Sequence, residues 1–124
     1  MHYVEGFVIP VPAGKRDEFI ESARQFDTAI MAEGALRIVE CWQDDVPPGK
    51  RTDMFRAVDA AEGEVVAFSW IEWPDKPTRD AAHARMQERM KTDPLFDAEK
   101  NPPPFDGKRM IFGGFVPVLV LGDK

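Results

Sequence analysis

The chain of 124 residues has the size of one domain, and its 44% hydrophobic and 31% charged residues are typical of a globular protein. Its net charge of −6 disfavours a nucleic-acid partner, which would require clustered Lys and Arg, and no apolar run approaches the roughly 20 residues of a membrane span. The first residues lack the basic and apolar regions of a signal peptide, so we expect a single cytoplasmic domain over residues 1–124 that contacts neither nucleic acid nor membrane.

Cys41 is the only cysteine, which excludes an internal disulfide and a paired-cysteine metal or redox site. It lies in a predicted strand, and no neighbouring His or basic residue is evident that would lower the pKa of its thiol. We therefore interpret Cys41 as a buried structural residue rather than a reactive thiol. The sequence predicts no metal and no cofactor.

The N-terminal part predicts a strand followed by a helix. The β-branched and aromatic residues of Met1–Val11 favour a strand, which Pro10 and Pro12 are expected to end because proline cannot donate to a ladder. Between residues 15 and 33, apolar residues recur at helical spacing and would form one face. These residues are Phe19, Ala23, Phe26 and Ile30. Gly34 is expected to end the helix in the left-handed conformation.

Two further strands flank a long connection. Residues 35–44 predict a strand. One of its faces is apolar except for one acidic residue, and it consists of Leu36, Ile38, Glu40 and Trp42. The connection that follows is longer than usual, and its residues 54–61 are expected to form a short helix. The run EVVAFSWIEW, residues 64–73, predicts the central strand, since both of its alternating faces are largely apolar.

The C-terminal part predicts a helix and a last strand. Asp75 or Thr78 can cap a helix that runs to about Thr92. A proline-rich loop then leads to a strand over residues 109–116, in which Gly113-Gly114 suggests a bulge or a close backbone approach. The apolar tail 118–121 is expected to form an extended segment at an interface.

This order of elements predicts an α+β, ferredoxin-like βαββαβ fold, a four-stranded antiparallel sheet with both helices on one face. The opposite face would be apolar and uncovered. A second copy of the chain is the simplest cover, so we predict a homodimer of the dimeric α/β barrel type. A monomer would instead require the tail 118–121 to cover the sheet.

Four segments together resemble the YbaA-like family of bacterial proteins in the dimeric alpha-beta barrel superfamily. They are YVEGFVIPVP, VECWQDDVPPGKRTDMFRAV, EVVAFSWIEW and PFDGKRMIFGGF. The resemblance covers nearly the whole chain and implies the same fold and dimer as the alternation of apolar residues. It implies no reaction, because no reaction is established for that family.

Glu40 is the first candidate for chemistry. If its face of the strand is interior, desolvation would raise its pKa, or a cation such as Arg56 or Arg109 would lower it. Either outcome could serve proton transfer. The alternative is a structural ion pair that holds the 44–61 loop to the sheet.

Other candidates lie in loops and in aromatic rows. Lys108 and Arg109 follow a turn, where they could lie at a pocket mouth or simply be solvated. Asp44 and its neighbour Asp45 point to opposite sides of a strand end, so we predict no metal there. Trp70 could line an apolar cavity, although a packed core and dimer interface explains the tryptophans better. His2 and His83 have no evident partner and are interpreted as incidental.

These observations support a homodimer that binds a small molecule in a pocket between the sheet, the helices and the 44–61 loop. The candidate ligand-binding residues are Glu40, Arg56, Lys108, Arg109, Asp44 and Trp70. No catalytic residue is assigned. Two alternatives stay open, namely a cofactor-free monooxygenase- or isomerase-like enzyme, by analogy of fold, and a structural or regulatory dimer without a ligand.

Overall fold

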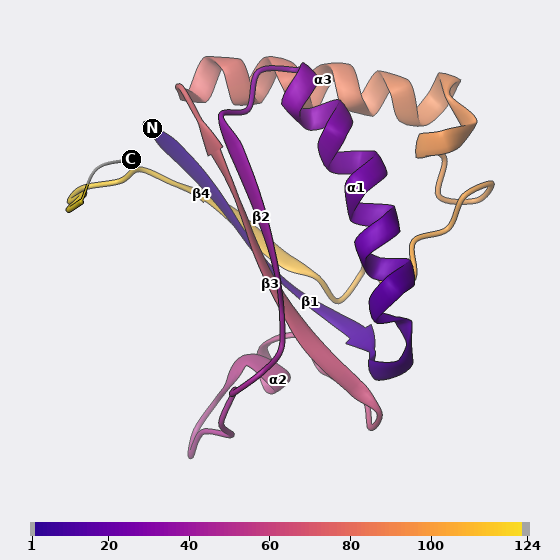
Figure 1. The fold of residues 1–124 in the computed structure, drawn as a ribbon, viewed down its shortest axis with the longest axis vertical. Coiled ribbons are helices and arrows are strands. Elements are labelled where there is room, and N and C mark those ends of the chain that lie inside the picture. Colours follow the sequence, from indigo (N-terminus) through magenta and orange to yellow (C-terminus); the bar gives the residue numbers. More distant parts are fainter. Residues whose placement is uncertain (1, 123–124) are drawn as a thin grey trace.

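Two long strands, β1 (Tyr3–Pro12) and β3 (Glu64–Trp73), form the centre of the sheet in the computed structural model, which describes residues 2–122 (Figure 1). They pair antiparallel over their whole lengths, as their β-branched and aromatic residues favour. The shorter strands β2 (Arg37–Trp42) and β4 (Ile111–Phe115) add antiparallel to β3 and β1, respectively. The order β2-β3-β1-β4 confirms the predicted ferredoxin-like βαββαβ arrangement.

Strand β1 continues beyond its predicted end and includes both Pro10 and Pro12. Proline cannot donate a backbone hydrogen bond, which is why the sequence predicted a stop there. However, β4 pairs only with residues 4–8 of β1, so the proline end of β1 has β3 as its single neighbour. A missing N–H group at this end therefore interrupts no second ladder.

Helices α1 (Arg16–Ala32) and α3 (Lys76–Thr92) cover one face of the sheet and diverge from each other, as Figure 1 shows. The end of α1 is as predicted, because Gly34 follows it with a φ of 116°. Asp75 caps α3, since its carboxylate accepts a hydrogen bond from the backbone N–H of Thr78 at 2.8 Å. The space between the diverging helices becomes important for the pocket described below.

The core between the sheet and the helices is built from the odd-numbered residues of β1 and β3. One cluster joins them to both helices, and a second joins them to the start of α1. The first contains Tyr3, Ile71 and Trp73 with Ala29, Ile30, Ala82 and Met86, and the second contains Ile9, Val11 and Ala67 with Phe19. Full burial of an apolar side chain of this size contributes about 1.5–3 kcal/mol, so these residues fix which face of the sheet meets the helices.

Short helical segments complete the connections. They are η1 (Ala13–Lys15), α2 (Met54–Ala57) and η2 (Pro94–Phe96). The connection that contains α2 contacts β3 on the face opposite α1 and α3, and at this end of that face Pro10 and Val66 are buried. The helix predicted over residues 54–61 corresponds to α2, which is only four residues long. None of the helices within residues 2–122 is long and apolar enough to span a membrane.

The rest of the face opposite the helices is uncovered, and we refer to it as the open face. It carries apolar side chains from three strands, and they also line a shallow hollow. They are Val4, Val8, Phe68, Trp70, Ile111 and Phe115. Cys41 lies beside Phe68 and is half-buried, whereas the sequence predicted a buried thiol, because no element covers this part of the sheet.

The segment after β4 lies outside the sheet. Strand β4 ends at Phe115, and residues 116–121 have no regular structure. Val118 is 94% exposed and Leu121 is 84% exposed, so this tail makes little use of its apolar side chains within one copy of the chain. The tail does not cover the open face, and its predicted place at an interface stays a prediction.

Candidate functional site

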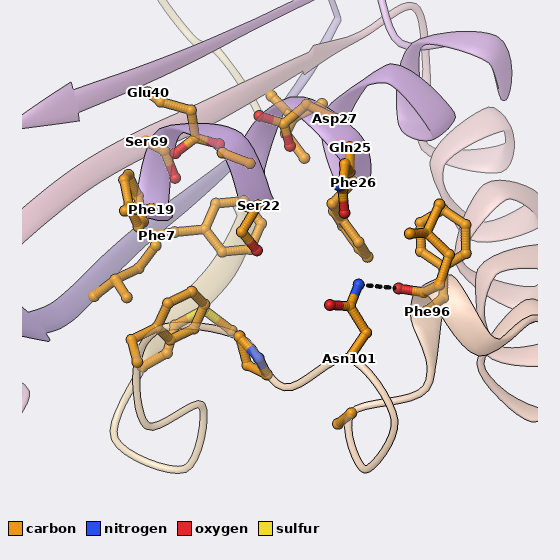
Figure 2. Close-up of a pocket in the computed structure, with 18 of the residues that line it drawn as sticks. Phe7, Phe19, Ser22, Gln25, Phe26, Asp27, Glu40, Ser69, Phe96 and Asn101 are labelled. Carbon is orange, nitrogen blue, oxygen red and sulfur yellow. Dashed lines mark hydrogen bonds between the residues drawn. The ribbon is translucent and has the colours of Figure 1, made fainter. Parts of the chain in front are cut away.

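A pocket of about 470 Å³ lies between the helix-covered face of the sheet, helix α1 and the segment 94–110 that follows α3 (Figure 2). The sheet contributes Phe7 and Ile9 from β1 and Ile71 from β3 to its floor. Helix α1 forms one wall, and residues 95–110 form the opposite side. The pocket exists because α1 and α3 diverge and the proline-rich segment, rather than a helix, closes the space between them.

Aromatic contacts hold segment 94–110 against α1. The ring of Phe19 lies 6.1 Å from that of Phe105, and the ring of Phe26 lies 6.1 Å from that of Phe96, edge to face. The guanidinium of Arg89 lies 4.4 Å above the centre of the Phe96 ring. Because these rings meet across the pocket, they both fix the segment and form apolar walls.

Polar contacts stabilise the same segment from within. The carboxylate of Asp93 accepts a hydrogen bond from the backbone N–H of Leu95 at 3.0 Å. The side-chain amide of Asn101 donates to the carbonyl oxygen of Leu95 at 2.8 Å, the bond drawn in Figure 2. These bonds turn a segment without helical or strand periodicity into a defined wall of the pocket.

Two acidic residues form the polar end of the pocket. Figure 2 shows Asp27 of α1 and Glu40 of β2 at the same side of the pocket, with Ser69 of β3 beside Glu40. Glu40 lies on an outer strand, and part of its side chain is exposed at the rim. Burial of the carboxyl, together with hydrogen bonding and charge repulsion from Asp27, raises the pKa of Glu40 to about 9, while hydrogen bonding with Ser69 acts in the opposite direction.

Burial also raises the pKa of Asp27, although hydrogen bonding with Glu40 partly opposes this effect. Both shifts favour protonation of the pair, as expected when two acids share one site. Glu40 lies on the helix side of β2, because its strand neighbours Ile38 and Trp42 pack against the helix-side core. Of the two alternatives for its pKa, desolvation or a nearby cation, the structure supports the first, since the charged lining residues of this pocket are both acidic.

Arg109 contacts Glu64 rather than Glu40. Its guanidinium makes two hydrogen bonds of 2.7 Å to the Glu64 carboxylate and one of 2.8 Å to the carbonyl oxygen of Asp59. It also donates to Asp106 at 3.0 Å. This arrangement joins the end of the long connection to β3, so the structural ion pair that was the alternative for Glu40 is formed by Arg109.

The other predicted ligand-binding residues lie apart from the pocket. Arg56 and Asp44 are exposed in the connection between β2 and β3, and Lys108 is exposed in the turn before β4. Trp70 lies on the open face, where its indole N–H donates to Glu72 at 2.8 Å. Of the six residues, only Glu40 lines the helix-side pocket, and the predicted 44–61 wall is replaced by segment 94–110, since the long connection lies against the opposite face.

A second polar cluster surrounds Glu5, which is only 1% exposed. Its carboxylate accepts a hydrogen bond from the indole N–H of Trp73 at 2.8 Å and lies 2.9 Å from Nε2 of His83. Arg79 approaches the same carboxylate at 3.8 Å and donates to the hydroxyl of Tyr3 at 2.7 Å. The interpretation of His83 as incidental is therefore wrong, because it is a partner of a buried acid from a distant strand.

Few features of the sequence indicate the Asp27–Glu40 pair or the polar cluster around Glu5. Asp27 follows Phe26 of the predicted apolar stripe, and one position along a helix is enough to turn it toward the sheet edge. Glu5 occupies the core-facing row of β1, and this position is the one signal that it needs a buried partner. Within residues 2–122, no group of three or more His, Cys, Asp or Glu side chains is arranged to hold a metal ion.

Comparison with known families matches residues 2–107 to the model of a protein of unknown function, DUF1428. The chain belongs to the DUF1428 family. This DUF1428 chain is 50% identical over 119 residues to the uncharacterized protein YbaA of Escherichia coli K12, a match that covers 96% of the chain and 98% of YbaA. YbaA of Shigella flexneri is equally similar, with the same identity and coverage. The resemblance to the YbaA-like family is thus confirmed.

Two solved structures share the fold of the DUF1428 chain. A dimeric ferredoxin-like protein from an uncultured marine organism has a TM-score of 0.59 at 10% identity, with 98% of this chain and all of that chain covered. An uncharacterized NIPSNAP domain protein from Burkholderia xenovorans has a TM-score of 0.54 at 22% identity, with coverage of 98% and 99%. At these identities the likeness shows the α+β ferredoxin-like fold alone.

Proposed function

We propose that this DUF1428 protein is a homodimer that binds a small, mainly apolar molecule in the pocket between the sheet, α1 and segment 94–110. The observation that carries the proposal is the pocket itself, with a volume of about 470 Å³, a mostly apolar lining and the two acidic residues Asp27 and Glu40 at one side. Ligand sites of proteins have this size and this composition, a mostly apolar lining with a few convergent polar groups.

The open face supports the homodimer. Phe68 is 43% exposed and Phe115 is 62% exposed, and they belong to one apolar surface across the sheet. Contiguous exposed apolar surface of this kind is typical of interfaces between proteins. The similar structure from a marine organism is described as dimeric, which also favours this assembly. Since the pocket lies on the helix-covered side, dimerisation through the open face would leave it accessible.

A substitution that fills the pocket tests the ligand-binding proposal. Ala23 lines the pocket from α1, and an Ala23→Phe variant would occupy much of its volume. The neutral fluorescent probe N-phenyl-1-naphthylamine, whose emission rises in apolar sites, should bind the wild-type protein and lose at least tenfold in affinity for the variant. Ala32→Phe, at an exposed position of the same helix, is the matched control and should bind as the wild type does.

Far-ultraviolet circular dichroism would establish that both variants are folded, because overpacking costs typically about 1–3 kcal/mol. If folded Ala23→Phe protein binds the probe as tightly as the wild type, the probe lies elsewhere and the pocket is not the binding site. If the wild type does not bind the probe at millimolar concentration, the pocket is closed to ligands and the proposal is wrong.

A further inference from the structure

The charged side chains that line the pocket are all of one sign. Asp27 and Glu40 are its charged lining residues, and no Lys, Arg or His is among the residues that surround it within the described part of the chain. An anionic ligand would therefore meet charge of its own sign at these two residues. A neutral ligand would leave the two acids facing each other as they do in the free protein.

The apolar lining is rich in aromatic rings. Five phenylalanines from β1, α1 and segment 94–110 surround the space next to the acids, namely Phe7, Phe19, Phe26, Phe96 and Phe105. The faces of aromatic rings attract cations, and cages of such rings recognise ammonium groups. A carboxylate beside the rings adds a full charge of the opposite sign. Aromatic walls with acidic residues at one end therefore suit an organic cation.

We propose that the ligand of this pocket is an organic cation, with an ammonium group between Asp27 and Glu40 and an apolar body among the phenylalanines. The inference rests on the proposed function, since it requires that the pocket binds a ligand. Figure 2 shows the arrangement that carries it, with both acids at one side of the pocket and the aromatic rings around the remaining space.

The shared proton of the acid pair gives this proposal a distinctive consequence. A bound cation stabilises both carboxyls in the ionised form, so binding should release the proton that the raised pKa of Glu40 favours in the free protein. Asp27 faces Glu40 from α1 and the uncharged Ser69 faces it from β3, while α3 and segment 94–110 contribute uncharged lining residues. The affinity for a permanent cation should therefore rise with pH, by at most about tenfold per pH unit for one released proton.

Two probes of the same shape test the class of ligand. Benzyltrimethylammonium carries a permanent positive charge, and neopentylbenzene has the same shape with carbon in place of nitrogen. We expect titration calorimetry at about pH 6, 7 and 8 to show that the cation binds at least tenfold more tightly than the hydrocarbon at the highest pH. Its affinity should rise with pH, and the heat should depend on the ionisation enthalpy of the buffer because a proton is released.

Substitutions of the acids separate charge from shape. The double variant Asp27→Asn/Glu40→Gln keeps the volume of both side chains, and it should lose at least tenfold in affinity for the cation together with the pH dependence. Glu18→Gln, which removes an exposed acid from the first turn of α1, is the control and should bind as the wild type does.

The outcomes distinguish this inference from the proposed function. If the hydrocarbon binds as tightly as the cation, the ligand is not a cation, whereas the pocket remains a binding site. If the cation binds more tightly but without pH dependence, the proton release is wrong and the preference for a cation is supported. If neither probe binds the wild type while N-phenyl-1-naphthylamine does so in an Ala23-dependent manner, the cation inference is again overturned and the pocket retained. If none of the three probes binds, both proposals are wrong.

Discussion

Replacing Glu5 by Ala would remove the acceptor at the centre of a buried polar cluster. Glu5 is 1% exposed and interacts with three residues from two other elements, namely Trp73 of β3 and His83 and Arg79 of α3. Arg79 also pairs with Asp80 at 3.3 Å and donates to the Tyr3 hydroxyl, so it keeps these partners in the variant. The variant would leave the buried indole N–H of Trp73 without its acceptor and would remove the buried carboxylate that His83 and Arg79 approach.

The expected loss follows from these contacts. A hydrogen bond to a charged group contributes about 1.5–3 kcal/mol, and removal of one partner of a buried ion pair costs about 3–5 kcal/mol. The interactions of Glu5 share one carboxylate, so their contributions do not add. We expect the free energy of unfolding to fall by about 3–5 kcal/mol for Glu5→Ala, and by less for Glu5→Gln, which keeps an acceptor for Trp73. Domains of this size are stable by only about 5–15 kcal/mol.

Urea unfolding at a fixed protein concentration, followed by tryptophan fluorescence and circular dichroism, would measure these values. Glu62→Ala, which removes an exposed acid in the turn before β3, should change stability by no more than about 0.5 kcal/mol. Comparison of Glu5→Ala, His83→Ala and the double variant would give the coupling energy between these two residues. A loss below about 1 kcal/mol for Glu5→Ala would refute the view that this cluster stabilises the junction between the sheet and α3.

Three further predictions follow from other contacts. Phe68→Glu places a charge on the open face, so light scattering should detect a monomer at micromolar concentration, and a persistent dimer would exclude this face as the interface. Gly114→Ala would bring a Cβ atom within 2.1 Å of the Tyr3 hydroxyl, so thermal unfolding should show a loss of about 1–3 kcal/mol, and an unchanged stability would contradict the close approach. Arg109 lowers the pKa of Glu64, a contribution that is present at neutral pH and lost as Glu64 protonates, so in urea unfolding Arg109→Met should be less stable than wild type at pH 7, and the difference should shrink in acid.

The fold could be predicted because its signals are local and periodic. Alternation in EVVAFSWIEW identified the inner strand β3 and its two apolar faces, and spacing of three and four residues identified α1. The same alternation grouped Glu40 with Ile38 and Trp42 on one face of its strand, and the structure shows that this face meets the helices. Gly113-Gly114 predicted either a bulge or a close backbone approach. The close approach is correct, because β4 pairs with β1 in regular register and a Cβ atom at Gly114 would collide with Tyr3.

The site could not be assembled from the sequence because its residues meet through tertiary packing. Segment 94–110 has no periodicity, so nothing in the sequence indicated that it would close the pocket in place of the 44–61 connection. Arg109 contacts Glu64, rather than Glu40, because its guanidinium lies at the start of β3, whereas Glu40 lies opposite Ser69 in the middle of that strand. Charge pairs across strands depend on register and loop path, which composition does not specify.

The raised pKa of Glu40 allows a test of the acid pair that requires no ligand. The unfolded chain loses this proton near the ordinary pKa of 4.5, whereas the folded protein keeps it to about pH 9, so between these values the folded state holds an extra proton and stability falls as pH rises. Glu40→Gln remains neutral, so it should gain stability over the wild type in urea unfolding from about pH 5 to pH 8, and Glu18→Gln should not. Parallel pH profiles for wild type and Glu40→Gln would mean that Glu40 is ionised in the free protein.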